Sequence, residues 1–588
     1  MKAIIYMFDS LNRRTLAPYA DTDLPLPNFA RLAAQAVTFE NFYAGSMPCM
    51  PARRELHTGR YNFLHRSWGP LEPFDDSMPQ LLREAGVHTH LASDHPHYWE
   101  DGGATYHTRY TTWECFRGQE GDPWKGVVGR GGRSAASTVA PHFGQDAINR
   151  RYMASEGEHP QTRTVDAGIE FIDTNAEADD WLLQLELFDP HEPFFAAERF
   201  RAADDDGEGS DWPRYRKVIE SEQEIARMRS RYAALVSMCD ASLGRVLDAM
   251  DRHSLWDDTL LIVNTDHGFL LGEHGWWAKS VQPWFNELVH LPMFLWDPRV
   301  ADPGTRRGDV AQTIDIAPTV LRWFGLEPPP DMQGEDLGPS AEPAAGHAGA
   351  LFGIHGGHVN VTDGRYVYMR AAVDEANQPL EEFTLMPTHM KSRFSVGELD
   401  GWEPSQPFRF TKGLRTMAMH AEALWLNPWQ HGTLLFDLQA DPGQQHPIAD
   451  DEVELAMLRL LATRMRESEA PPSQFQRLGI PPTAEPGPEH LLVRIQAGRA
   501  AAMAEPIREL AQLARPGTAG AELLTMPVQQ LLARSDLRCA VEEHLPGLVG
   551  TELVAASAQM TLLDAAATGA ATAEQVRGIL AHGTKEQL

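Results

Sequence analysis

Hydrophobic residues along the chain gather in short runs, and longer amphipathic stretches separate the runs. Four of the runs have the length and composition of buried strands: 3–8, 87–92, 181–188 and 260–264. In the intervening stretches hydrophobic residues recur with helical periodicity, most clearly over 221–252. Strands that alternate with helices predict an α/β fold with a large, mostly parallel sheet flanked by helices.

Each predicted strand leads directly into a polar stretch. These stretches are 9–12, 93–97, 189–191 and 265–267. In open parallel sheets, ligands bind beyond the carboxyl ends of the strands. We therefore expect the polar side chains to converge on one crevice at that edge of the sheet.

Breaks in the pattern divide the chain into three predicted parts. Residues 1–350 form a catalytic α/β domain, which a helix over 313–321 closes before proline- and glycine-rich coil. Residues 351–480 form a smaller α+β subdomain with a small antiparallel sheet. Residues 481–588 are rich in alanine and leucine with helical periodicity. They predict an appended helical module for packing or oligomerisation.

The subdomain is predicted from three segments. Strands are expected at 365–370 and 433–438, and a helix near 452–466. A glycine- and arginine-rich stretch at 129–133 is typical of a flexible loop rather than of an anion-binding cradle.

Composition excludes several classes of partner. The formal net charge of −31 disfavours nucleic acid, because an acidic surface repels a phosphate backbone. No segment reaches the roughly 18 apolar residues of a membrane span. The four cysteines are far apart and lack metal-ligand spacing, which favours a reducing compartment over a disulfide framework. The short apolar N-terminus lacks a signal-peptide cleavage site, so we expect a cytoplasmic protein.

The segment 46–60 carries the most specific motif. It contains Cys49, Pro51 and Arg53, followed by Thr58 and Gly59. Taken alone, Cys49 would be a buried, inert thiol near the start of a helix. The spacing resembles the sulfatase signature, a Cys-x-Pro-x-Arg core followed by Thr-Gly, and further motifs are needed to support it.

A second block lies at 264–279 and contains Asp266, His267 and Lys279. It is similar to the block of iduronate-2-sulfatases and related bacterial sulfatases in which Asp-His binds metal and a later lysine reaches the sulfate. Residues 188–194, with His191, resemble the family's His-x-Pro-Phe site. The N-terminal strand that ends in Asp9, where the family has its first metal carboxylate, is the fourth motif. Four motifs in the family order make coincidence an unlikely origin.

The resemblance implies a cofactor made from the chain itself. In this family, which belongs to the alkaline phosphatase superfamily, a separate formylglycine-generating enzyme oxidises the cysteine, here Cys49. The hydrated aldehyde carries one hydroxyl that attacks the ester and a second that later expels the bound group. A divalent metal is implied at Asp9, Asp266 and His267, with Ser10 completing the shell. Calcium is the family expectation, and manganese is an alternative because His267 offers nitrogen.

The resemblance also implies roles for the remaining residues. Arg53 lies one helical turn after Cys49 and would hold the second oxygen of the hydrate. Lys279 and His191 would bind the sulfate, and His191 would protonate the departing alcohol. His95 and His97 occupy the positions of the family's Lys-x-His pair. By this resemblance, His95 would bind substrate, and His97 would take the proton from the second hydroxyl of the hydrate.

Two positions depart from the family pattern. Ser10 stands where most sulfatases have a second acid, and His95 stands where they have lysine. Asn12 is a weaker competitor for the place of Ser10. His88 and His90 share one face of a predicted strand and are expected to be ordinary packing or surface residues.

We interpret the chain as a metal-dependent sulfuric ester hydrolase acting on a small-molecule sulfate monoester. The first alternative is a phosphonate monoester or phosphodiester hydrolase on the same scaffold, because such enzymes have a similarly altered metal shell. A second is a noncatalytic anion- or metal-binding protein with unmodified Cys49. The intact Cys49, Pro51 and Arg53 core disfavours that reading.

Overall fold

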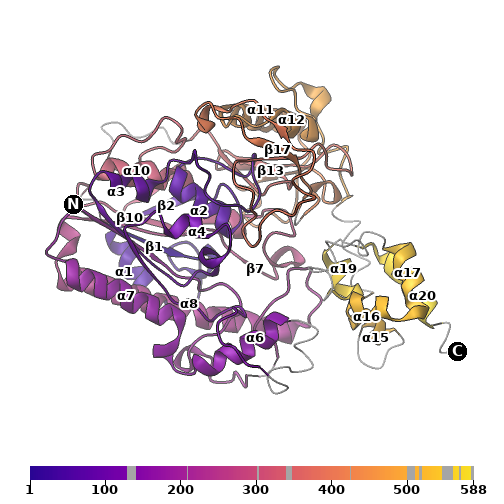
Figure 1. Ribbon diagram of the computed structural model, residues 1–588, viewed down its shortest axis with the longest axis horizontal. Helices are drawn as coiled ribbons and strands as arrows, with labels where there is room; N and C mark the ends of the chain where they lie inside the picture. The colour runs from indigo at the N-terminus through magenta and orange to yellow at the C-terminus, as the bar shows by residue number, and fades with distance from the viewer. Residues whose placement is uncertain are drawn as a thin grey trace.

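The structure is a computed structural model. It describes residues 1–128, 141–207, 209–300, 303–339, 347–423, 426–499, 510, 512–514, 520–545, 560–568 and 571–584. Figure 1 shows a large body built on a central sheet, with smaller sheets at one end and a group of short helices beside it. The stretch 129–133 and parts of the predicted C-terminal module, including 546–559, lie outside the described residues.

The central sheet contains the four predicted strands. They are β1 (Lys2–Phe8), β3 (His88–Ser93), β5 (Trp181–Glu186) and β6 (Thr259–Thr265). The strand order is β11-β2-β10-β6-β1-β5-β3-β4, with β9 paired to β2. The other strands are β2 (Val37–Tyr43), β4 (Thr112–Cys115), β9 (His290–Leu291), β10 (Met293–Trp296) and β11 (Arg306–Gln312). The described sheet is mostly parallel, and β10 runs antiparallel to both of its neighbours.

Helices cover both faces of this sheet. Ile4 and Tyr6 of β1 pack with α1 (Pro27–Gln35), α7 (Pro160–Asn175) and α8 (Glu222–Arg252). Ile5 and Met7 face the other way, and their cluster includes residues of α2 (Cys49–Thr58), α3 (Met78–Glu84) and α10 (Ile316–Trp323). Alternation along a strand therefore places hydrophobic side chains in two cores, as a doubly covered sheet requires.

The boundaries of the predicted helices are close to those in the structure. Ser221 caps α8, and its side chain and that of Glu224 form a reciprocal capping box. The helix expected from Thr313 begins as a 3-10 turn, Thr313–Asp315, before α10. Shorter helices of the main body are α4 (Ala104–His107), α6 (Pro141–Asn149) and α9 (Asn286–Val289).

Two smaller sheets follow the main sheet in the chain. The first, in the order β12-β13-β14-β18, is antiparallel. Its strands are β12 (Ala350–Gly353), β13 (Val359–Thr362), β14 (Tyr366–Arg370) and β18 (Leu434–Asp437). The second contains β15 (Glu381–Thr384), β16 (Glu403–Pro404) and β17 (Met417–His420). Helices α11 (Asp451–Glu467) and α12 (Pro472–Leu478) complete this part.

This second part shares a hydrophobic core with the N-terminal part. Leu351, Tyr368 and Leu458 belong to one buried cluster with Tyr61 and Phe63. The strands and the helix expected near 365–370, 433–438 and 452–466 correspond to β14, β18 and α11. The domain boundaries at 350 and 480 remain predictions.

The described C-terminal residues form short helices with a core of their own. These helices are α15 (Ala521–Thr525), α16 (Val528–Ala533), α17 (Ser535–His544), α19 (Leu562–Thr568) and α20 (Ala573–Thr584). Leu524, Leu537 and Ile579 belong to their shared hydrophobic cluster. Within the described part of the chain, every helix is too short or too polar to cross a membrane.

Candidate active site

Three segments of the main body bring polar side chains together at one edge of the central sheet. Asp9 follows β1, Asp266 and His267 follow β6, and Cys49 is the first residue of α2. One potential ligand atom from each of these four residues lies within 4.8 Å of the others. Because β1 pairs with β6 in parallel register, their carboxyl ends deliver Asp9 and Asp266 side by side.

Cys49 lies at the centre of this group. Its Sγ is 3.2 Å from Nε2 of His267 and 3.4 Å from Nζ of Lys279. The residue is 2% exposed. Burial, with the nearby Asp9 carboxylate as a further cause, raises the pKa of the Cys49 thiol well above its usual range. The unmodified thiol is therefore a poor nucleophile at neutral pH.

Arg53 is fully buried among three carboxylates. Its guanidinium donates to Glu186 Oε1 at 2.5 Å, to Asp266 Oδ2 at 2.7 Å and to Asp9 Oδ2 at 3.1 Å. It also donates to the carbonyl oxygen of Cys49 at 3.0 Å. The structure thus places Arg53 beside Cys49, as the helical spacing predicts. Its guanidinium is hydrogen-bonded to the three carboxylates. Its predicted contact with the hydrate remains a prediction.

Asp9 and Asp266, the two predicted metal ligands with carboxyl groups, differ in their tendency to ionise. Burial opposes ionisation of Asp9, but Lys279 and Arg53 hold the pKa of its carboxyl well below the usual range. Burial and the adjacent Asp9 raise the pKa of Asp266. The two carboxyls therefore share a site in which the first stays ionised at the expense of the second.

Ser10 links Asp9 to the lysine. Its hydroxyl donates to Asp9 Oδ1 at 2.8 Å and accepts from Lys279 Nζ at 2.8 Å. Its backbone has a φ of 66°, in the left-handed region. Asn12 instead caps the following turn by accepting from the amide of Arg14 at 2.9 Å, which removes it from competition with Ser10.

His267 has a defined tautomer. Its Nδ1 donates to the carbonyl oxygen of Gly268 at 2.9 Å, so Nε2 carries the lone pair that faces Cys49. Burial and the charge of Lys279 lower the pKa of His267 to about 3. A neutral imidazole with a free Nε2 is the form that binds metals.

His95 lies beside Asp9, and its ring is next to that of His97. His95 is fully buried, its Nδ1 is 3.8 Å from Asp9 Oδ2, and neither ring nitrogen has a hydrogen-bond partner among the described residues. Burial and Arg53 lower the pKa of His95 well below its usual value, so its ring is neutral. His97 differs because its Nδ1 pairs with Glu100 Oε2 at 2.7 Å.

His191 lies among further acids. Its Nδ1 donates to the carbonyl oxygen of Glu192 at 2.6 Å, and its ring stacks on Phe188 with centroids 4.1 Å apart. Ligand atoms of Glu120, His191 and Glu192 lie within 4.8 Å of one another. Burial raises the pKa of Glu120 to about 8 and that of Glu192 to about 7. Because burial removes these acids from solvent, they are only partly ionised at neutral pH.

Sequence reasoning missed the acids that orient the site. Glu186 holds Arg53 and also accepts from the hydroxyl of Tyr98 at 2.7 Å, while Glu100 orients His97. Glu186 carried one available signal, since a charged residue inside a buried parallel strand is unusual. Glu100 follows a short turn and carried no comparable signal. His88 and His90 both pair with Thr112 at the sheet edge, which confirms their structural reading.

Comparison with known proteins identifies the family. A family model for sulfatases matches residues 3–326, more than half of the 588 residues. The chain belongs to the sulfatase family and is accordingly a sulfuric ester hydrolase.

Curated relatives match a similar share of the chain. An N-acetylglucosamine-6-O-sulfatase of Bacteroides thetaiotaomicron is 24% identical over 58% of this chain and 70% of its own length. The multifunctional alkaline phosphatase superfamily protein PehA of Trinickia caryophylli is 27% identical over 54% of this chain and 71% of its own. A choline-sulfatase of Rhizobium meliloti is 25% identical over 55% and 67%.

Solved structures support the fold. A phosphonate monoester hydrolase from Silicibacter pomeroyi superposes with a TM-score of 0.54 and 17% identity, covering 80% of this chain and 95% of its own. A structure in complex with its substrate D-glucosamine-2-N,6-O-disulfate superposes with a TM-score of 0.52 and 16% identity, covering 79% and 98%. At these identities the likeness concerns the fold alone.

Proposed function

We propose that this sulfatase cleaves a small-molecule sulfate monoester with a formylglycine derived from Cys49 and one divalent metal ion. The observation that carries the proposal is the position of Cys49. Its Sγ faces His267 Nε2 and Lys279 Nζ, within the group that also contains Asp9 and Asp266. As the first residue of a helix at this point, residue 49 can contact a bound anion, a metal and a lysine simultaneously.

The residues present fit a divalent metal. Asp9 and Asp266 offer carboxylate oxygens, and His267 offers the lone pair of Nε2. Ser10 would add a neutral hydroxyl oxygen. Two hard carboxylates suit calcium, while the imidazole nitrogen also suits manganese. A cation held there would polarise a bound sulfate oxygen and lower the pKa of a neighbouring hydroxyl.

A formylglycine at position 49 would supply a hydrated aldehyde, whose hydroxyl serves as the nucleophile. The surrounding residues would then act on substrate. Lys279 Nζ, already 3.4 Å from Sγ, would neutralise an oxygen of the sulfate. His97 donates from Nδ1 to Glu100, which leaves Nε2 free to accept a proton. His95 would contribute a neutral imidazole to the same anion site.

His191 is suited to the leaving alcohol, but only once an anion is bound. Its Nδ1 proton is committed to the carbonyl of Glu192, so a proton for the alcohol must reside on Nε2. Burial and Lys279 lower the pKa of His191 well below its usual value. The negative charge of bound sulfate opposes both effects and favours the doubly protonated ring.

The test is the mass of the tryptic peptide that contains Cys49, from protein made in a host that supplies the formylglycine-generating enzyme. Replacement of the thiol by an aldehyde lowers the mass by about 18 Da relative to the cysteine form. An unmodified thiol in active protein would overturn the proposed nucleophile. An unmodified thiol in inactive protein, after maturation was supplied, would favour the noncatalytic binding protein.

Two residues favour a second candidate, a phosphonate monoester or phosphodiester hydrolase. Ser10 replaces an acid and so removes one negative charge from the metal shell, and His95 is neutral where most sulfatases have lysine. Both changes alter the charge that the site presents to an ester. Comparing kcat/KM for an aryl sulfate, an aryl phosphonate monoester and a phosphodiester separates the candidates, because the preferred ester has the highest value.

We also propose that the protein acts in the cytoplasm. The support is that all four cysteines are free in the structure, as expected in a reducing compartment. Fractionation of the native host tests the location.

A further inference from the structure

The C-terminal helices contact one segment of the main body, residues 211–220. Asp564 of α19 accepts a hydrogen bond from Arg214 Nη1 at 3.1 Å, and its Oδ1 forms an ion pair with Arg216 Nε at 3.1 Å. The side chains of Arg216 and Asp564 are only 10% and 12% exposed. Ile219 packs against the hydrophobic cluster of the helices. Partial burial makes this ion pair stronger than one in open solvent.

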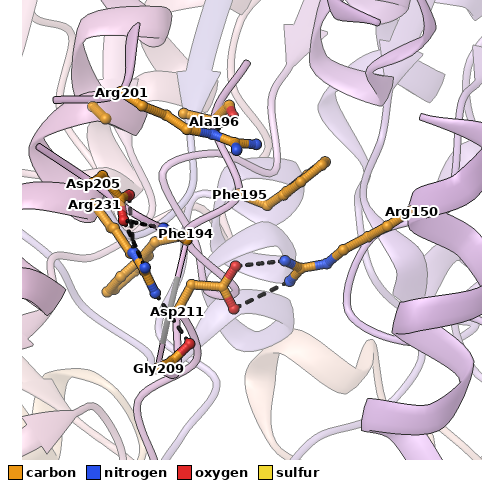
Figure 2. Close-up of a pocket in the computed structure, with 11 residues that line it drawn as sticks. Arg150, Phe194, Phe195, Ala196, Arg201, Asp205, Gly209, Asp211 and Arg231 are labelled. Atoms are coloured by element: carbon orange, nitrogen blue, oxygen red, sulfur yellow. Dashed lines mark hydrogen bonds and ion pairs between the residues drawn. The ribbon is translucent and has the colours of Figure 1, made fainter. Parts of the chain in front are cut away.

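The start of the 211–220 segment is fixed to the main body. Figure 2 shows Asp211 facing Arg150, with two contacts between the carboxylate and the guanidinium. Their lengths are 2.5 and 3.2 Å. The carbonyl oxygen of Asp211 accepts from the amide of Phe194 at 2.7 Å. Phe194 is three residues after His191, so this end of the segment adjoins the catalytic loop.

The end of the segment pairs with the block that carries Lys279. The amide of Val218 donates to the carbonyl of Gly275 at 2.8 Å, and the amide of Trp277 donates to the carbonyl of Arg216 at 3.0 Å. Trp277 also donates from its indole nitrogen to Glu220 at 2.8 Å. Trp277 precedes Lys279 by two residues. Movement of the segment would therefore move the backbone that presents the lysine.

The middle of the segment contacts the residue next to His191 in the chain. The hydroxyl of Tyr215 forms a hydrogen bond with the carboxyl of Glu192, the residue after His191. Tyr215 lies between Arg214 and Arg216, the two residues that contact Asp564. One carboxylate of the C-terminal helices thus holds both neighbours of a residue that contacts the site.

We infer that the C-terminal helices act as a brace for the active site, and that Asp564 is a positioning residue for His191 and Lys279. Asp564 touches neither residue. It acts through Arg214 and Arg216, which fix the 211–220 segment against Glu192 on one side and Trp277 on the other. The catalytic part of this inference rests on the proposed function. The mechanical part, that Asp564 holds the segment, stands apart from it.

The first test measures hydrogen exchange in the full-length chain. In Asp564→Asn, the amides of Val218 and Trp277 should exchange faster, on the order of tenfold, because local opening needs less free energy. Asp564→Glu keeps the charge and should restore most of the protection. Glu574→Gln, on the exposed surface of α20, is the matched control and should change nothing. Unchanged exchange in Asp564→Asn would overturn the brace.

Arg214→Gln is a second variant for the case in which Asp564→Asn disturbs the fold of the C-terminal helices. It removes one arm of the brace from the main body, where the arginine side chain is 47% exposed. If Asp564→Asn loses the cooperative unfolding of the helices, Arg214→Gln is the variant to use. Faster exchange at Val218 and Trp277 with the helices intact supports the brace, and unchanged exchange overturns it.

The second test measures turnover of the ester class that the wild-type protein prefers. Asp564→Asn should lower kcat/KM on the order of tenfold, and Tyr215→Phe should lower it as well. The double variant should be little worse than the poorer single variant, because both act through one contact. Additive losses would overturn positioning through Tyr215. Wild-type protein that turns over no ester would refute the proposed function, while the exchange data would still decide on the brace.

Discussion

The Sγ of Cys49 lies 3.2 Å from Nε2 of His267, and that nitrogen holds a lone pair because Nδ1 donates to the carbonyl of Gly268. The side chain of residue 49 and an atom suited to metal binding are therefore direct neighbours. One consequence is that a change at residue 49 and a change in the metal shell should affect the same step. The following predictions examine the members of this group separately.

Replacing Cys49 by alanine should abolish turnover while the fold and metal binding persist. The change removes the only source of the proposed aldehyde but leaves Asp9, Asp266 and His267 in place. We expect kcat/KM to fall by at least about 10³-fold. Turnover, circular dichroism and bound metal are the measurements. Cys539→Ala, at an exposed cysteine, is the control and should retain activity. Activity surviving in Cys49→Ala would exclude residue 49 as the nucleophile.

Chelation should inactivate the matured enzyme, and added metal should restore it. Asp9 and Asp266 are buried carboxyl groups that can bind a cation, and they lie with His267 in one group. Dialysis against a chelator should reduce turnover by on the order of 10²-fold or more. Titration with calcium and then with manganese shows which ion restores it at the lower concentration. Full activity in protein that elemental analysis shows to be metal-free would refute the metal requirement.

Ser10→Asp should tighten metal binding. The change restores a second acid after Asp9, and the backbone φ of 66° at this position is one that aspartate tolerates better than most residues. An added carboxylate at the metal should raise affinity by about tenfold. Ser10→Asn has nearly the same shape without the charge and is the matched control. Equal affinities of the two variants in a competitive chelator titration would place Ser10 outside the shell.

Glu100→Gln should move the acid limb of the kcat profile to lower pH, because His97 is proposed to act after the alcohol has left. Burial lowers the pKa of His97, and the Glu100 carboxylate partly offsets that effect by favouring the charged ring. Without this charge the pKa of His97 falls further, so the neutral base persists to lower pH. The maximal kcat should drop by about tenfold because the ring loses its orienting partner. The neighbouring Asp101→Asn is the control, and an unmoved limb would show that another group titrates.

Arg53→Met should destabilise the metal-free protein strongly. Arg53 pairs with Asp9, Asp266 and Glu186. Its loss leaves Asp266 and Glu186 without that cation, and Asp9 with Lys279 alone. We expect the free energy of unfolding to fall by about 3–5 kcal/mol. Added divalent metal should recover part of this loss, because it supplies charge to Asp9 and Asp266. Denaturant unfolding with and without metal is the measurement. Arg365→Gln, at an exposed ion pair with Asp437, should unfold like wild type.

Much of the architecture follows from the sequence. The runs that became β1, β3, β5 and β6 are short and hydrophobic, and each ends where polar residues begin. Parallel pairing of β1 with β6 then brings Asp9 and Asp266 together without further information. Period and strand-end polarity are local signals, which explains why they can be read directly from the chain.

The missing parts are those that depend on long-range contacts. Sequence gives no means of knowing that Glu186 would reach Arg53, which is 133 residues away along the chain, or that Asp564 would reach Arg216. The helical spacing of Arg53 from Cys49 was readable, yet its three carboxylate partners were not. Side-chain pairing across elements is fixed by packing of the whole fold and leaves no periodic trace.

The burial of Cys49 also bears on how active protein can be produced. With 2% of its surface exposed and its sulfur enclosed between His267 and Lys279, the residue is out of reach of another protein's catalytic centre once folding is complete. Any enzyme that converts this cysteine must meet the chain while α2 is still unformed. Under the proposed maturation, the active fraction of a preparation would therefore be fixed before folding is complete, and raising it afterwards would require unfolding the chain.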